Sequence, residues 1–110
     1  MKTKNLILTT LALAATTAAL SAADVAANWE KSCQKCHGAD GKGQTPMGKK
    51  QNIKDFTDAK YQDSFKDADA TKAIKEGFKV GDATKMAPIE GLTDAEIKDL
   101  VAKVRSFKPK

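Results

Sequence analysis

The sequence predicts an all-α domain, and three observations support this prediction. Residues 93–107 begin with the capping box Thr-Asp-Ala-Glu and continue with apolar residues at steps of three and four. Residues 67–76 carry a shorter helical pattern, which Gly77 ends. We find no strand pattern that could supply a βαβ unit. Helices are therefore expected to bury most of the core.

Residues 1–23 predict a cleaved secretory signal peptide, which leaves residues 24–110 as one domain. Lys2 and Lys4 form the basic start, an apolar stretch follows over residues 6–20, and small residues end the segment. The apolar stretch has about fifteen residues and is interrupted by threonines, so it is too short for a stable membrane span. The mature chain of roughly 87 residues is expected outside the cytoplasm, in the bacterial periplasm.

The size of the mature chain predicts a stabilising group in its core, and its net charge argues against nucleic-acid binding. A domain this small, with few large apolar residues, normally needs a disulfide, a metal or a prosthetic group to complete its core. The whole chain carries a net charge of +5, and losing Lys2 and Lys4 with the signal peptide lowers it to +3. That excess is too small to predict nucleic-acid binding.

The mature chain begins with a predicted helix over residues 24–33. Asp24 suits its N-terminus, because a negative charge there interacts favourably with the helix dipole. Val25, Trp29 and Cys33 follow at steps of four and fall on one face. We expect Trp29 to be a core aromatic residue.

The middle of the chain alternates between loops and short helices. Three glycines within residues 38–43 predict a turn-rich loop, which Pro46 and Met47 are expected to continue. Residues 58–63 can form a short helical turn, and the helix over residues 67–76 comes next.

An extended loop and the clearest helix end the chain. Residues 81–91 are predicted to form the loop, and Pro109 is expected to stop the final helix. The residues of that helix that are predicted to face the core are Ile97, Leu100, Val101, Val104 and Phe107.

Two cysteines and the chain's only histidine stand together in Cys33-Gln-Lys-Cys36-His37. This spacing is the signature of c-type haem attachment. Side chains three residues apart lie on one face of a helical turn, so both sulfurs can bond to the two vinyl groups of one porphyrin. The imidazole that follows can then reach the iron. If the cysteines hold haem, His37 has to be the proximal ligand, because the chain has no other histidine.

Three other uses of these residues stay open at this point. Cys33 and Cys36 could form a disulfide, or a thioredoxin-like redox pair, although that motif belongs beside a βαβ unit. Zinc could be bound by Cys33, Cys36 and His37, but a structural zinc site normally has a fourth Cys or His ligand. Haem agrees best with the predicted export and the thin core.

A methionine is expected to be the second iron ligand. Met1 leaves with the signal peptide, so Met47 and Met86 are the soft neutral donors of the mature chain. We favour Met86, because it lies in a loop after a helix, where the chain can return over the opposite haem face. Met47, a lysine or an open iron position are the alternatives.

Three segments, in this order, resemble a small bacterial class I cytochrome c with a single haem. They are the attachment motif with the Gly-Ala-Asp-Gly that follows it, Lys85-Met-Ala-Pro88, and the terminal helix from Leu92 to Ser106. The resemblance covers essentially the whole mature chain. It implies the cytochrome c fold, in which crossed N- and C-terminal helices and shorter helices surround one covalently bound haem c.

Residue by residue, the resemblance makes Cys33 and Cys36 the thioether sites, His37 the proximal ligand and Met86 the distal one. It also implies that Pro46 lies near His37, where a backbone carbonyl commonly accepts the second imidazole N–H. The hydroxyl of Tyr61 is a candidate partner for a haem propionate.

The resemblance also implies how the two terminal helices pack. Trp29 falls where the family packs an aromatic residue against the terminal helix, and Leu100 fits the facing position. Lys103 departs from the family pattern, because many members carry an aromatic residue there. Val25 stands where many carry glycine or alanine, and Ala87 separates the usual Met-Pro pair.

The implied function is that of a soluble periplasmic electron carrier, and not of an enzyme. An iron with both axial positions filled by the protein has no vacancy for substrate. Two alternatives stay open: a haem-based ligand-binding or sensor protein with a displaceable Met86, and the electron-transfer subunit of a periplasmic oxidoreductase. The implied partners are redox proteins, with no nucleic acid and no stable membrane insertion, and the chain is expected to be a monomer.

Two sets of residues are expected to surround the haem. Basic residues could steer an acidic redox partner towards its exposed edge, and they are Lys31, Lys35, Lys42, Lys49, Lys50, Lys79 and Lys85. The candidates for apolar packing are Ile53, Phe56, Tyr61, Phe65, Ile74, Phe78 and Ile89.

Overall fold

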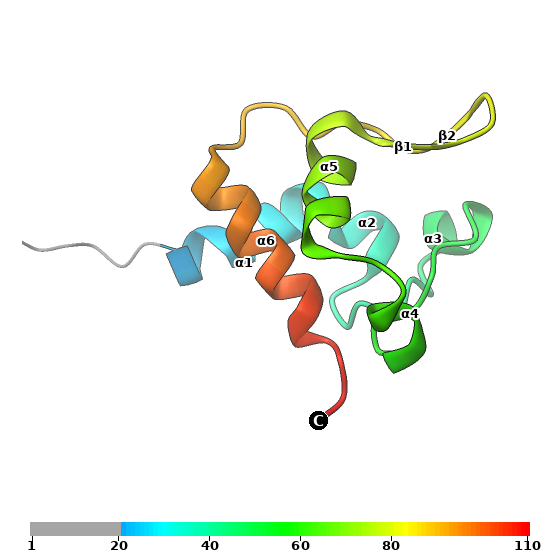
Figure 1. Cartoon of the computed structure of the whole chain (residues 1–110), viewed down its shortest axis with the longest axis horizontal. Coiled ribbons are helices and arrows are strands. Elements are labelled where there is room, and N and C mark those ends of the chain that lie inside the picture. Colours follow the sequence, from blue (N-terminus) through cyan, green and yellow to red (C-terminus); the bar gives the residue numbers. More distant parts are fainter. Residues whose placement is uncertain (1–20) are drawn as a thin grey trace, which may run out of the picture.

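A computed structural model describes residues 21–110, and its two terminal helices pack against each other (Figure 1). They are α1 (Ser21–Ser32) and α6 (Asp94–Ser106). The signal peptide predicted for residues 1–23 lies outside the described residues, apart from its last three, which begin α1. Within the described part of the chain, no helix is long and apolar enough to cross a bilayer.

Shorter elements lie between the two terminal helices in the sequence. The described chain forms α2 (Gln34–His37), α3 (Pro46–Lys50), α4 (Ala59–Asp63), α5 (Asp67–Glu76), β1 (Phe78–Val80) and β2 (Ala83–Met86). The predictions of a helical turn over residues 58–63 and of a helix over residues 67–76 are confirmed by α4 and α5.

Side chains cap these helices where the sequence predicts their ends. Thr93 Oγ1 accepts the backbone N–H of Glu96, and the Glu96 carboxylate accepts the backbone N–H of Thr93, both at 3.1 Å. The predicted capping box of α6 is therefore confirmed. Asp58 caps α4 by accepting the N–H of Lys60, and Gly77 ends α5 with a φ of +80°.

The prediction that Pro46 and Met47 continue a loop is wrong. Both residues lie in α3, which starts at Pro46. Thr45 is the N-cap, and its hydroxyl accepts the backbone N–H of Gly48 at 2.9 Å. Proline suits the first helical position, because its fixed φ matches the helix and its missing N–H has no partner to lose.

The loop expected over residues 81–91 contains a strand. Its residues Ala83–Met86 form β2, which pairs with β1 to make an antiparallel hairpin. Phe78 is paired with Met86, and the register is irregular after Phe78. Strands of three and four residues are too short to show a clear alternating pattern.

The core gathers on the faces of α1 and α6 that touch. Trp29 of α1 is 3% exposed and Leu100 of α6 is 1% exposed, which confirms both as core residues. The other buried apolar residues are Cys33, Phe56, Ile74, Ile97, Val101 and Val104. The four core positions predicted for α6 from Ile97 to Val104 are thus all buried, and Phe107 packs against the same cluster.

Phe78 differs from its expected role, and Lys103 takes part in a contact that the sequence does not predict. Phe78, a candidate for apolar packing, is 52% exposed on the hairpin, and Val80 beside it is 57% exposed. Lys103 is half-buried, and its ammonium lies 5.1 Å from the centre of the Phe107 ring. An attractive cation–π contact thus occupies the position at which the resemblance implies an aromatic residue.

Candidate haem-attachment site

The two cysteines and His37 lie where α1 passes into α2. The N–H of Cys33 donates to the carbonyl of Trp29 at 2.9 Å and closes the last turn of α1. The N–H of His37 donates to the carbonyl of Cys33, also at 2.9 Å, and forms the turn of α2. Cys33 itself has a φ of −120° and separates the two helices. Both thiols and the imidazole therefore lie within one turn of backbone.

The segment that follows this turn folds back over it, and hydrogen bonds satisfy the carbonyl groups of residues 36–38. The carbonyl of His37 accepts the N–H of Gly43 at 2.8 Å, and the carbonyl of Gly38 accepts the Trp29 indole N–H at 3.0 Å. The hydroxyl of Thr45 donates to the carbonyl of Cys36 at 2.9 Å. These bonds replace the intrahelical partners that a short helix lacks at its C-terminus.

Gly48 of α3 allows the backbones to approach each other here. A Cβ atom at this position would collide with the carbonyl oxygens of Gly43 and Cys36. We expect Gly48→Ala to lower the free energy of unfolding by about 1–3 kcal/mol, since an added methyl group in a packed site forces the backbone to shift. Denaturant titration of the holoprotein measures the change.

The matched control is Lys49→Ala in the same helix, since Lys49 is exposed. Its effect is expected to stay within about 0.5 kcal/mol, as for most surface substitutions. A Gly48→Ala protein as stable as the wild type would contradict the close packing of α3 on the attachment turn.

Burial controls the protonation of the site. Desolvation lowers the pKa of His37 to about 4, so its imidazole is neutral at pH 7 and has a lone pair free for a metal. Burial, with a smaller contribution from Cys36, raises the pKa of the Cys33 thiol to about 11. A thiol–disulfide redox centre needs a lowered thiol pKa. The thioredoxin-like alternative is therefore disfavoured.

The arrangement of Cys33, Cys36 and His37 also argues against the disulfide and the zinc site. Cys33 and Cys36 are both free thiols. In the part of the chain that the structure describes, no group of three or more His, Cys, Asp or Glu side chains is arranged to hold a metal ion. Cys33, Cys36 and His37 thus do not converge on one point, as zinc would require. Donors spread over one turn fit the vinyl groups and iron of a porphyrin.

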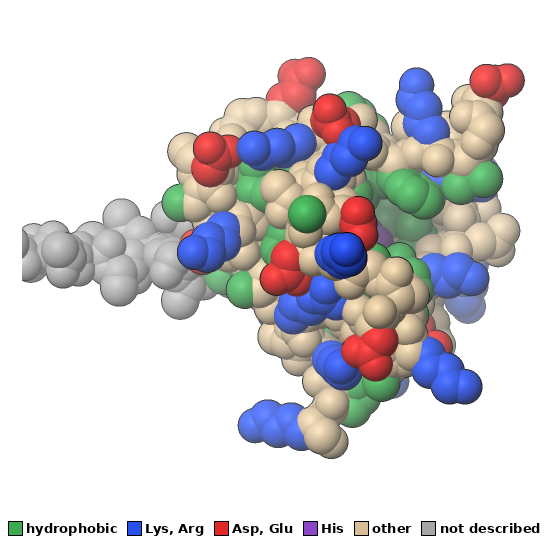
Figure 2. Space-filling model, in the orientation of Figure 1, with side chains coloured by type: hydrophobic (Ala, Val, Ile, Leu, Met, Phe, Trp, Pro, Cys, Tyr) green, Lys and Arg blue, Asp and Glu red, His purple; other side chains and the backbone are tan. Residues whose placement is uncertain are grey.

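Aromatic rings surround the imidazole of His37. The ring of Phe56 stacks on it, with centroids 4.7 Å apart and planes 19° apart. The Trp29 ring lies at 5.9 Å, tilted by 40°. Figure 2 shows the histidine at the bottom of a recess between apolar side chains, beside the hairpin. The recess is where a flat apolar group could contact the imidazole.

The expected hydrogen bond from His37 to a carbonyl near Pro46 is not formed. His37 Nδ1 is buried and has no hydrogen-bond partner among residues 21–110. Pro46 is exposed at the start of α3. Phe56 and Trp29 are the aromatic neighbours of this imidazole.

The two methionines differ in their surroundings. Met86 ends β2 and packs against the core cluster that includes Cys33. A hydrogen bond of 2.9 Å from the N–H of Ile89 to the carbonyl of Ile74 ties the segment after Met86 to α5. Met47 is half-buried in α3 and is not among the residues packed against that cluster. The fold thus associates Met86, rather than Met47, with the core.

The sequence does not predict that the side chain of Gln62 is buried. Its side chain is 1% exposed, and its amide N–H groups donate to the carbonyls of Phe56 and Val104, each at 2.8 Å. A glutamine in a short polar helix carries no sequence signal of such burial, because its two partners lie 6 and 42 residues away.

Comparison with known proteins adds a family match. The family model of cytochrome c matches residues 22–108. Similar solved structures include the KustC0563 c-type cytochrome and a variant of it in which one tyrosine is replaced by phenylalanine. Each is 34% identical to this chain, with a TM-score of 0.65. The first alignment covers 74% of this chain and 93% of that protein, and the second covers 77% and 99%. No curated protein matches.

Proposed function

This chain belongs to the cytochrome c family, and we propose from that membership that it carries single electrons between proteins of the bacterial periplasm. The family has an all-α fold and covalently bound haem c. In our proposal one haem is held by thioether bonds to Cys33 and Cys36, with His37 and Met86 as its axial ligands.

The observation that supports this proposal most strongly is the attachment turn. It presents two unpaired thiols and a buried imidazole within one turn of backbone. The low pKa of His37 keeps that imidazole neutral, which is the form that binds a metal. His37 is also the only histidine of the chain, so the proximal role has no competitor.

The proposed ligand set favours electron transfer over catalysis. His37 and Met86 would hold the haem iron, and the haem would supply one-electron exchange. With both side chains bound, a substrate would find no free position on the iron. A thioether ligand raises the reduction potential relative to a second histidine. Burial acts in the same direction, because the more highly charged oxidised centre is poorly solvated there.

Absorption spectra of the purified mature protein in both oxidation states test the proposal. We expect the bands of a c-type haem, together with the weak long-wavelength band of methionine-bound ferric iron. Mass spectrometry should show the mature polypeptide with the added mass of one haem. A polypeptide of unmodified mass from periplasmic material would contradict the proposal.

Periplasmic location follows from the predicted signal peptide over residues 1–23. The basic start, short apolar stretch and small residues near Ala23 are typical of such a peptide. Fractionation of cells expressing the whole gene, with N-terminal sequencing of the mature protein, would test both the location and the cleavage site.

Two lysines of the hairpin support docking of an acidic redox partner close to Met86. Lys79 lies in β1 and is exposed, and Lys85 lies in β2 beside Met86 and is half-buried. By contrast, three acidic groups elsewhere are neutralised in ion pairs, Asp63 with Lys108, Asp67 with Arg105 and Asp94 with Lys75.

We expect electron transfer to an acidic redox protein to slow several-fold as ionic strength rises, because salt screens the attraction that brings the partners together. Stopped-flow rates with a small acidic redox protein measure this effect. Lys79→Glu should weaken the salt dependence, and Lys98→Glu on α6 is the control. A rate that does not change with ionic strength would contradict electrostatic steering.

A further inference from the structure

Three aromatic side chains, Phe56, Tyr61 and Phe65, form a row that ends under the guanidinium of Arg105. The rings of Phe56 and Tyr61 are stacked with centroids 6.0 Å apart, and those of Tyr61 and Phe65 lie at 5.2 Å and are tilted by 53°. The guanidinium carbon of Arg105 is 4.3 Å from the centre of the Phe65 ring, which is a cation–π contact. At the other end of the row, Phe56 stacks on His37. This aromatic row thus connects the attachment turn with α6.

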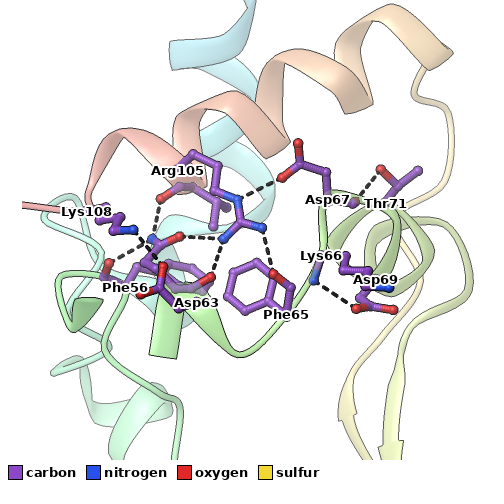
Figure 3. A network of polar contacts seen from close by, with 11 residues as sticks. Phe56, Asp63, Phe65, Lys66, Asp67, Asp69, Thr71, Arg105 and Lys108 are labelled. Atoms are coloured by element: carbon purple, nitrogen blue, oxygen red, sulfur yellow. Dashed lines mark hydrogen bonds and ion pairs between the residues drawn. The ribbon is translucent and has the colours of Figure 1, made fainter. Parts of the chain in front are cut away.

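Arg105, the chain's only arginine, holds the segment that carries Tyr61 and Phe65 (Figure 3). Its guanidinium donates to the backbone carbonyl of Gln62 and, at 2.7 Å, to that of Phe65. It also donates to the side-chain oxygen of Gln62 at 3.0 Å and to the Asp67 carboxylate at 2.8 Å. A planar fork of donors fixes several acceptors at once, which a lysine could not do. The end of α4 and its link to α5 are therefore fixed on α6.

The side chain of Gln62 extends this fixation to Phe56. Gln62 is 1% exposed, and its amide N–H groups donate to the carbonyls of Phe56 and Val104, each at 2.8 Å. Because its oxygen accepts from Arg105, the buried amide has partners for both its donor and its acceptor. Losing the guanidinium would leave the buried oxygen without that partner. All three members of the aromatic row thus depend on Arg105.

We propose that Arg105 is a positioning residue, which keeps the aromatic row closed against water beside the attachment turn. Phe56 is 8% exposed, and Tyr61 and Phe65 are half-buried and pack against the core cluster. The proposal rests on the proposed function, because excluding water there raises the reduction potential: the more highly charged oxidised centre is then poorly solvated.

The holoprotein carrying Arg105→Lys tests the proposal, since this substitution keeps the positive charge and removes the fork of donors. We expect its midpoint potential to fall below that of the wild type in a spectroelectrochemical titration, because water reaches the oxidised centre more easily. The net charge is unchanged, so loss of a cation does not account for such a fall.

Tyr61 supplies a second measurement that does not depend on electron exchange. It is the chain's only tyrosine, so a ¹³C label in the tyrosine ring gives a single NMR signal. In the reduced holoprotein, a soluble neutral paramagnetic agent broadens this signal according to the exposure of the ring. The broadening should be greater in Arg105→Lys than in the wild type.

Lys98→Arg is the matched control, because it makes the reverse exchange at an exposed position of the same helix. It should leave the midpoint potential and the broadening at their wild-type values. Three results would overturn the proposal: a wild-type potential in Arg105→Lys, a fall in potential without greater broadening at Tyr61, or an equal fall in Lys98→Arg.

If Arg105→Lys gives no folded holoprotein, Phe65→Leu carries the test. It removes the ring under the guanidinium and keeps an apolar side chain. We expect a smaller fall in potential with greater broadening at Tyr61, and wild-type values of both would overturn the proposal. Failure of the proposed function is distinguishable, because the wild-type protein itself would then show no reversible one-electron titration.

Discussion

Replacing Cys33 and Cys36 together by serine should abolish covalent haem and leave a chain that does not melt cooperatively. The mature domain of roughly 87 residues is small enough to need more than its own apolar side chains for stability. Among the residues that the structure describes, eight form the buried apolar core, and one of them is Cys33 itself. Without a bound porphyrin the core is incomplete. Absorption spectra, mass spectrometry and thermal melting followed by circular dichroism measure the three consequences.

Lys35→Ser is the matched control for this double variant. Lys35 lies between the two cysteines and is exposed, so its replacement leaves both attachment positions and the core intact. It should keep haem and melt like the wild type. A Cys33→Ser/Cys36→Ser protein that folds and melts in one cooperative transition would show that the polypeptide alone supplies enough stability.

Replacing Met86 by alanine should remove the distal ligand without removing the haem. The weak long-wavelength band of the ferric protein should disappear. The midpoint potential should fall by on the order of 0.1–0.3 V, a part of the roughly 0.8 V range that axial ligands cover. The thioether is a soft neutral donor that favours ferrous iron, so its loss stabilises the oxidised state. Spectroelectrochemical titration measures both effects.

Met47→Ala is the control, because Met47 lies in α3 and not among the residues that pack against the core cluster. It should leave the band and the potential unchanged. Reduced Met86→Ala should also bind carbon monoxide rapidly, whereas the wild type should bind it slowly. Loss of the band in Met47→Ala instead would reverse the ligand assignment. Rapid, tight binding by the wild type would favour a ligand-binding or sensor protein.

The sequence predicted those parts of the fold that depend on local patterns. The capping box at Thr93 and the apolar spacing from Ile97 to Val104 need only neighbouring residues, and α6 forms as they predict. The burial of Trp29 was also predicted. The attachment motif was visible for the same reason, since Cys33, Cys36 and His37 lie within five residues.

The burial of Gln62 and the stacking of Phe56 on His37 depend on contacts between distant parts of the chain. Gln62 is buried because its amide bridges two carbonyls, one of which lies 42 residues away in α6. The stacking of Phe56 on His37 joins residues that are separated by the whole glycine-rich loop. The helix at Pro46 does have a local signal, because a capping threonine precedes a proline that suits the first helical position, although a loop is predicted there.

The exposed hairpin of β1 and β2 should separate from the rest of the molecule more readily than the helices do. Five of its seven strand residues are exposed, and only Lys85 and Met86 are partly covered. Segments with little buried surface separate from the rest at a low free-energy cost, as independent foldons. Backbone amides of the hairpin should therefore exchange with deuterium well before those of α6, whose inner face is buried. The arm that bears Met86 should thus detach while the attachment turn stays folded.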